Sequence, residues 1–193
     1  MKSKINSILS EIDKKKNELK VEYHKLMVKY GFTFSKGKII FNSNIIKTNK
    51  KYKKSIYDSI FNAKIREILS MPFIYAMLFP AIFLDLMLFI YQQTAVRLYG
   101  IPFVVRKDYI IFDRGQLDYL NFLQKMNCMF CTYVNGLFAY ATEIGGRTER
   151  YWCPIKHAKK TAGSHEREKH FADYGDAEGF KETFCKDNNT YKK

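Results

Sequence analysis

The stretch MPFIYAMLFPAIFLDLMLFIY, residues 71–91, is the part of the sequence that decides the fold. It carries a single charged residue, Asp85, and as a helix it would extend about 31 Å, the thickness of a bilayer hydrocarbon core. We therefore expect a mainly α-helical, membrane-associated protein with one apolar helix. Because Pro80 removes a helical hydrogen bond in mid-segment, this helix should be kinked or broken.

Two polar residues of this region are candidates for a role inside the membrane. A carboxylate in hydrocarbon costs about 2.5–3.5 kcal/mol on insertion scales, so Asp85 should be protonated, paired, or turned toward water or protein. Gln92 lies two turns further on and can share the same face. A hydrogen-bonded structural role for Asp85 is the simpler interpretation, and a proton or substrate role is the alternative.

Charge indicates which partners the chain attracts. The sequence holds 33 Lys and Arg against 19 Asp and Glu, a net charge of +14, which favours anionic lipid headgroups or nucleic acid. Most of the basic excess precedes the apolar segment, as in a juxtamembrane polybasic region, and no common nucleic-acid-binding motif is present. We expect a lipid bilayer as partner and no nucleic acid.

Cysteines and a histidine occur at metal-ligand spacing in the second half of the chain. Cys128 and Cys131 form a C-x2-C pair, and Cys153 with His157 forms a C-x3-H pair. Three thiolates and one imidazole complete the tetrahedral shell that structural zinc prefers, so we expect a zinc site in a reducing compartment. A [2Fe–2S] cluster and buried, unligated cysteines are the alternatives.

A fold that brings these pairs together can be written from the sequence. Asp113 with Gln116 should cap a helix that ends at about Glu143, where Gly145–Gly146 stops it. Cys153 would then be the N-cap of a second helix, with Pro154 in its first turn, folding back onto the first. The polar face that carries Cys128 and Cys131 supplies two residues expected to donate hydrogen bonds to the thiolates, Gln124 and Asn135.

Two arginines near this site, Arg147 and Arg150, are candidates for binding a phosphate or lipid headgroup. Pairing with Glu143 or Glu149 is the commoner fate of such side chains. No phosphate-cradling glycine loop and no serine-nucleophile motif is present, so the sequence does not identify a reaction.

The N-terminal region, residues 1–54, is basic and amphipathic. Apolar residues recur at helical spacing over residues 5–30, which indicates self-association or binding of a protein partner, and Gly31 suits the end of that helix. Residues 32–41, FTFSKGKIIF, predict a short β-hairpin. A further helix beginning at Ser55 resembles one that lies in the headgroup layer, with ordinary globular packing as the alternative. With the kinked apolar segment it forms a second region over residues 55–98.

Several segments resemble a family of small bacterial membrane proteins of unassigned activity. The likeness lies in DRGQLDYLNFLQKMNCMFC, NGLFAYATEIGGRTERYWCPIKHA and HFADYGDAEGF, and covers roughly residues 71–180. It implies a bacterial membrane location and adds no catalytic residue. Residues 99–160 would form a helical Cys/His unit and residues 161–193 a polar tail.

The expected function is a membrane-associated structural or interaction module in the bacterial inner membrane, with its zinc site facing the cytoplasm. The alternative is a membrane-bound enzyme or electron carrier with an iron–sulfur centre or a lipid-linked substrate. One straight crossing would place the basic N-terminal region and the thiols on opposite sides. A helix broken at Pro80 that enters and leaves by one leaflet would keep both in the cytoplasm.

Overall fold

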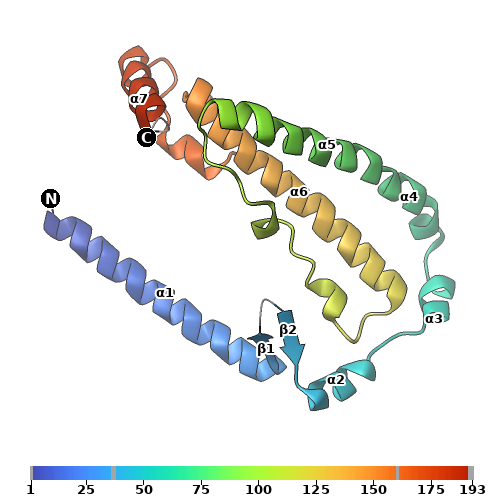
Figure 1. The fold of residues 1–193 in the computed structure, drawn as a ribbon. Helices are drawn as coiled ribbons and strands as arrows, with labels where there is room; N and C mark the ends of the chain where they lie inside the picture. Colours follow the sequence, from blue (N-terminus) through green and yellow to red (C-terminus); the bar gives the residue numbers. More distant parts are fainter. Residues whose placement is uncertain (1, 36–37, 160, 191–193) are drawn as a thin grey trace. The chain divides into compact units, whose positions relative to one another are not determined.

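The computed structural model describes residues 2–35, 38–159 and 161–190, and it confirms a mainly helical fold (Figure 1). The chain divides into two compact units. Unit 1 comprises Met1–Phe61 and Asp113–Lys125, and unit 2 comprises Asn62–Phe112 and Met126–Lys193. Each unit therefore combines two stretches of the chain that are distant in sequence.

Unit 1 follows local sequence signals closely. Helix α1 (Lys2–Tyr30) ends where Gly31 adopts a positive φ of 58°, which confirms the predicted cap. Strands β1 (Phe32–Ser35) and β2 (Lys38–Phe41) pair antiparallel, which confirms the hairpin, although its turn lies outside the described residues. The other elements described within unit 1 are two short helices and a 3₁₀ turn, besides the first residues of the next long helix: α2 (Ser43–Lys50), α3 (Ile56–Phe61) and η3 (Arg114–Gln116).

Two predicted helices in or near unit 1 differ in detail from the structure. The start after Ser55 is confirmed by α3, but this helix ends at Phe61. A separate helix, α4 (Ile65–Ala76), begins after Lys64, whose backbone N–H donates to the Glu67 carboxylate at 3.2 Å. The turn after Asp113 remains a 3₁₀ turn. Helix α6 (Phe122–Trp152) instead begins after Asn121, whose side chain and that of Gln124 each accept the other's backbone N–H, at 2.9 and 3.0 Å.

The apolar segment forms two consecutive helices in unit 2, α4 and α5 (Leu78–Tyr91), followed by a π-helical turn, η1 (Gln92–Val96). The two helices meet at Met77. Pro80 explains the break, because it lacks the N–H that would bond the Ala76 carbonyl, and the prediction of a proline break is confirmed.

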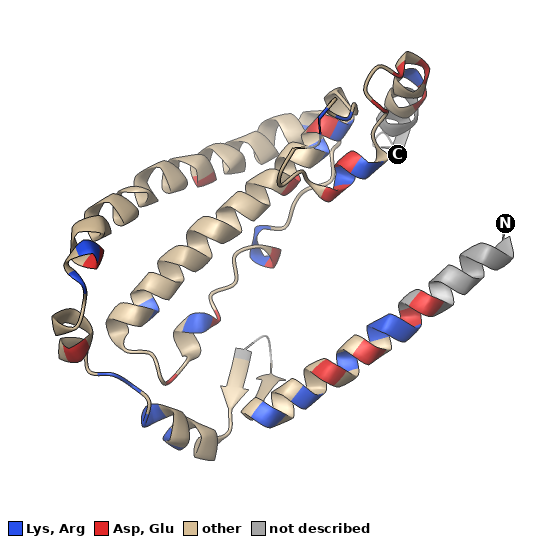
Figure 2. Ribbon diagram, turned by 180° about the vertical axis from the view of Figure 1, so that it is seen from behind, with Lys and Arg blue, Asp and Glu red and all other residues tan. Residues whose placement is uncertain are grey.

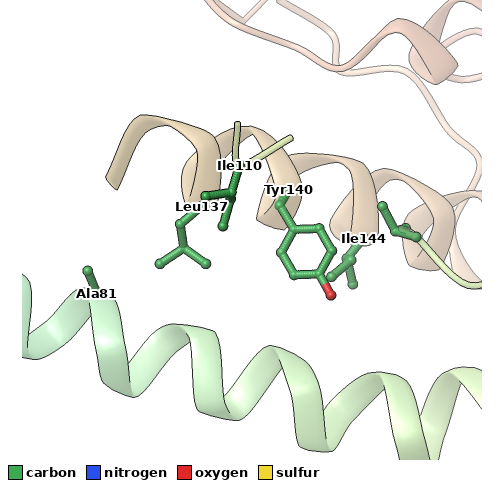
Figure 3. Close-up of a cluster of buried hydrophobic side chains, with 6 residues drawn as sticks. Ala81, Ile110, Leu137, Tyr140 and Ile144 are labelled. Carbon is green, nitrogen blue, oxygen red and sulfur yellow. The ribbon is translucent and has the colours of Figure 1, made fainter. Parts of the chain in front are cut away.

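After the apolar helix the chain turns back in a largely extended stretch, residues 101–112, which we call the return segment; it contains the 3₁₀ turn η2 (Arg106–Asp108). Within unit 2, α6 then runs parallel to α4 and α5. Tyr75 bonds Asn127 near the start of α6, and Tyr91 bonds Thr148 near its end. Side chains from α5, the return segment and α6 form the core drawn in Figure 3: Ala81, Val104, Ile110, Leu137, Tyr140 and Ile144.

The chain beyond α6 packs back onto unit 2. Ile155 forms a parallel β-bridge with Ala172, and both Phe171 and Ala172 are buried. Residues 153–172 therefore form a strap, which includes the 3₁₀ helix η4 (Glu166–His170) and precedes α7 (Ala177–Thr190). The segment predicted to be a polar tail thus contributes two core residues.

Candidate functional site

Among the described residues, one helix, Ile65–Val96, is long and apolar enough to cross a membrane by length and composition, with a mean hydropathy of 2.3 over its most apolar window. Only 6% of that window is buried by the protein itself. Figure 2 shows this helix as an almost uncharged ribbon, whereas the return segment carries both signs of charge. Within unit 2, the surface of this apolar helix is therefore largely uncovered.

Asp85, the one carboxylate of α5, is paired. The Arg106 guanidinium donates to both of its oxygens, Nε to Oδ1 at 3.1 Å and Nη2 to Oδ2 at 2.6 Å. The Tyr133 hydroxyl of α6 donates to Oδ2 at 3.0 Å. The Asp85 hydrogen bond raises the pKa of Arg106 above its ordinary value, although burial works against it. One carboxylate thus joins α5, the return segment and α6, as the structural interpretation of Asp85 predicts.

Gln92 clamps the backbone of the return segment. Its Oε1 accepts the Val104 N–H at 2.8 Å, and its Nε2 donates to the Val104 carbonyl at 3.3 Å and to the Tyr140 hydroxyl. Gln92 and Val104 are both buried. An extended segment that is not paired in a sheet needs other partners for its backbone groups. Here the Gln92 side-chain amide supplies a donor and an acceptor for the backbone of Val104. Gln92 is the first residue of the π-helical turn, a local distortion frequent at specialised sites.

Arg147 holds the start of the return segment. Its Nη1 donates to the carbonyls of Pro102 and Phe103, at 2.7 and 3.0 Å, while its Nε donates to Glu143 at 2.8 Å. Arg167 from the strap donates to the same Glu143 oxygen, with Nη2 at 2.5 Å. Burial raises the pKa of Glu143, but the hydrogen bonds from Arg167 and Arg147 outweigh it, and the net pKa lies below its ordinary value. Arg147 is therefore committed to internal contacts.

The strap is fixed to α6 by a histidine. His165 Nε2 lies 2.7 Å from the Glu149 carboxylate, and its ring packs on Gly146, where an added Cβ would lie 2.8 Å from the ring. Beside this contact is an open cleft of about 600 Å³ lined mainly by ionisable side chains of both signs: Lys156, His157, Ser164, His165, Glu166, Glu168 and Lys169. Hydrogen bonds from the Ser164 side chain and the His157 backbone contribute to lowering the pKa of Glu168 in this cleft.

The predicted end of α6 at Gly145–Gly146 is wrong, because the helix continues to Trp152. A glycine inside a helix costs only about 1 kcal/mol, and Gly146 is where the His165 ring fits against the backbone. The helix that was expected to start at Cys153 is also absent: residues 153–157 are irregular apart from the bridge at Ile155.

The four predicted metal ligands consequently do not converge. Cys128 and Trp152 are 24 helical residues apart, about 36 Å, and Cys153 follows at that far end. No group of three or more His, Cys, Asp or Glu side chains in the described parts of the chain could hold a metal ion. Cys131, Cys153 and His157 are exposed, and Cys128 is half-buried. As arranged here the residues do not fit one zinc ion or cluster, and metal binding stays a prediction.

The remaining predicted site residues have other roles. Asn135 donates to the backbone carbonyl of Cys131 at 2.9 Å rather than to a thiolate, and Gln124 caps α6. Arg150 is half-buried in the last turns of α6. Sequence reasoning missed the Tyr133 and Tyr140 hydroxyls, because tyrosines in an apolar run look like ordinary core residues.

Comparison of the chain with protein families, with curated proteins and with solved structures found no match. The residues and their contacts are therefore the basis for assigning a function. They include an apolar helix with one face left uncovered, and three side chains, Asp85, Gln92 and Arg147, that bond helices of unit 2 to the return segment.

Proposed function

We propose that this protein is a membrane-associated structural or interaction module, anchored to a bilayer by α4 and α5. The observation that carries the proposal is the uncovered apolar surface of these helices, where Phe73, Phe79 and Phe83 are 75, 78 and 63% exposed. Soluble proteins rarely leave a continuous surface of such side chains in water. A bilayer supplies the missing apolar environment.

The rest of unit 2 suits the role of a rigid support. Asp85, Gln92 and Arg147 each form a hydrogen bond from a helix to the return segment. The hydrophobic core of unit 2 is formed by side chains of α5, α6 and this segment. None of these three side chains is left unpaired, so their contacts hold the fold rather than await a substrate. This arrangement supports an anchoring or binding role and requires no bound metal.

Partner binding through α1 is the second part of the proposal. Leu19, Tyr23 and Leu26 occupy one side of this helix and are 69, 47 and 46% exposed within unit 1. An amphipathic helix with an open apolar stripe can pair with another copy or with a different protein.

The test of the anchoring role is fractionation of the full chain produced in bacterial cells. We expect the protein in the membrane pellet after washing with high salt, because burial of apolar side chains is insensitive to ionic strength. Phe79→Lys should move a substantial share of the protein to the supernatant or lower its level. Leu19→Lys, an equally exposed apolar position on α1, is the matched control and should leave membrane binding unchanged.

Recovery of the wild-type protein in the supernatant after gentle lysis would contradict the proposal. Equal behaviour of Phe79→Lys and wild type would show that the apolar surface of α5 is not the anchor.

A further inference from the structure

The faces of α5 differ sharply around its circumference. The positions that pack against the rest of unit 2 recur at steps of three and four, and include Ala81, Asp85 and Gln92. Phe83 and Ile90 lie two and five residues from Asp85, which places them about 140–160° around the helix from it. They are 63 and 45% exposed. The exposed side chains of both helices from Phe73 to Ile90 are apolar, and they extend from this face to the borders of the side that carries Asp85: Phe73, Phe79, Ile82, Phe83, Leu86, Phe89 and Ile90.

The opposite side of the same helix packs on the apolar core of unit 2 and on the return segment, which carries charged residues as well as Phe103, Val105, Ile111 and Phe112, 41, 46, 56 and 48% exposed. Arg106 is bonded to Asp85, and Lys107 and Asp108 follow it; all three of these return-segment residues are exposed. Asp85 lies only four to five residues past the middle of the helix Ile65–Val96, about 7 Å along its axis. Charged, exposed residues therefore flank the central part of the apolar helix rather than its ends.

This juxtaposition does not suit a helix that stands across the bilayer. The hydrocarbon core extends about 15 Å on each side of its centre, so a centred crossing would place Lys107 and Asp108 well inside it. Sliding the helix until Asp85 reaches the surface would instead expose Leu86, Phe89 and Ile90 to water. Neither position along the axis puts both the charged residues in water and the apolar residues in lipid.

We infer that α4 and α5 lie along the membrane surface, with the face that contains Phe73, Phe83 and Ile90 inserted into one leaflet and the charged turn Arg106–Asp108 of the return segment directed to water. This inference rests on the proposed membrane anchoring and specifies its geometry. The occupant of the open face is the boundary between headgroups and acyl chains of a phospholipid leaflet. The net charge of +14 favours a leaflet that contains anionic lipid.

Such a geometry also removes the conflict between charge and thiol location. A helix that lies in one leaflet leaves both ends of the chain on the same side, so the basic residues and the cysteines can share one compartment without a hairpin through the bilayer. Pro80 then serves to break a surface helix rather than to reverse its direction.

Tryptophan depth measurements test this inference, because Trp152 is the only tryptophan in the chain. Three variants, Phe73→Trp, Phe83→Trp and Ile90→Trp, are made in a Trp152→Phe background and bound to vesicles of phosphatidylcholine and phosphatidylglycerol. Quenching is compared between lipids brominated near the headgroup and lipids brominated deep in the acyl chain. We expect the same ratio of shallow to deep quenching at all three positions, with shallow quenching stronger.

A helix across the bilayer gives a different pattern. Positions 73 and 90 are then separated by about 25 Å along the membrane normal, so the ratio changes from one position to the next and Phe83→Trp is quenched most by deep bromines. That gradient would overturn the inference while leaving membrane anchoring intact. Vesicle binding without quenching at any position would also overturn it, because the face would then be covered by protein, such as a second copy. Failure of the wild-type chain to sediment with vesicles would refute the anchoring proposal itself.

Discussion

Unit 1 and unit 2 differ in where their side chains find partners. In unit 1 the described contacts are mostly local: the hairpin is bonded to itself, and Tyr23 stacks on Phe34 with ring centroids 6.2 Å apart. Every buried hydrophobic residue of the described chain belongs to unit 2. Local patterns are enough to form the elements of unit 1, whereas unit 2 depends on contacts between segments distant in sequence.

Polar side chains matter most where the core is small. Among the residues that the structure describes, ten hydrophobic ones are buried in unit 2, and no strand pairs with the return segment. Gln92 and Arg147 therefore satisfy backbone groups that a sheet would otherwise satisfy. Their removal should damage unit 2 far more than comparable changes damage unit 1.

The largest effect is expected from Gln92→Leu. This change leaves the buried Val104 N–H and carbonyl without partners, and each unpaired group costs about 1–3 kcal/mol, so the free energy of unfolding should fall by about 4 kcal/mol. Denaturation in detergent micelles measures the loss, and amide exchange should rise first in residues 101–110. Gln93→Leu, at an exposed neighbouring position, is the control. Equal stability of both variants would show that the clamp is dispensable.

Gly136→Ala should come next. A Cβ at this position would lie 2.6 Å from the Tyr109 carbonyl oxygen and 3.0 Å from Ile110 Cγ1, so the return segment must move. We expect a loss of about 2–3 kcal/mol. Gly145→Ala is a matched control on the same helix, because nothing lies within 4 Å of its added Cβ. That change should stabilise α6 by about 0.5–1 kcal/mol, and a loss there would show that α6 bends at the double glycine.

The sequence predicts correctly those features of the fold that depend on neighbouring residues. Periodicity, Gly31 and Pro80 were enough to predict α1, the hairpin and the break in the apolar helix, because each signal acts within a few residues. The end of α6 was mispredicted at Gly145–Gly146, since a local helix breaker was outweighed by the contact between Gly146 and His165. The partner of Asp85 also lies beyond local patterns, because Arg106 is 21 residues away across a reversal of the chain.

Asn121→Ala tests unit 1. This side chain is 1% exposed, accepts the Gln124 N–H, and donates to the Lys54 carbonyl and the Ser59 hydroxyl, at 3.3 and 2.7 Å. Loss of the cap and of these bonds should cost about 2 kcal/mol. Faster amide exchange should be confined to residues 54–61 and 113–125. Asn135→Ala, which removes only a bond to its own helix, should change little; spread of the Asn121→Ala effect into residues 101–110 would contradict independent units.

Glu143→Gln should have a smaller, pH-dependent effect. The charged carboxylate pairs with Arg147 and Arg167, so the substitution should cost about 1.5 kcal/mol at neutral pH. Because the pKa of Glu143 is lower in the folded than in the unfolded chain, its stabilisation is present above the ordinary value of 4.5 and is lost as the pH falls through the folded pKa. Wild type and variant should therefore converge in stability as the pH falls below 4.5 and through the lowered folded pKa of Glu143. A difference that does not depend on pH would exclude the charge as its cause.

The smallest effect on stability is expected from substitution of the cysteines. Cys128 lies near the start of α6, and Cys153 directly follows its end. Because about 36 Å of helix separates Cys128 from Cys153, one ion cannot be shared by both pairs in this arrangement. Cys153→Ser should leave unchanged any zinc that the purified, reduced protein holds through Cys128 and Cys131, as measured by elemental analysis. Cys185→Ser, outside both pairs, is the control. Loss of the same single zinc per chain in both Cys128→Ser and Cys153→Ser would contradict this arrangement. In that case α6 would have to fold back at Gly145–Gly146, and the zinc site predicted from the sequence would be correct instead of the continuous helix.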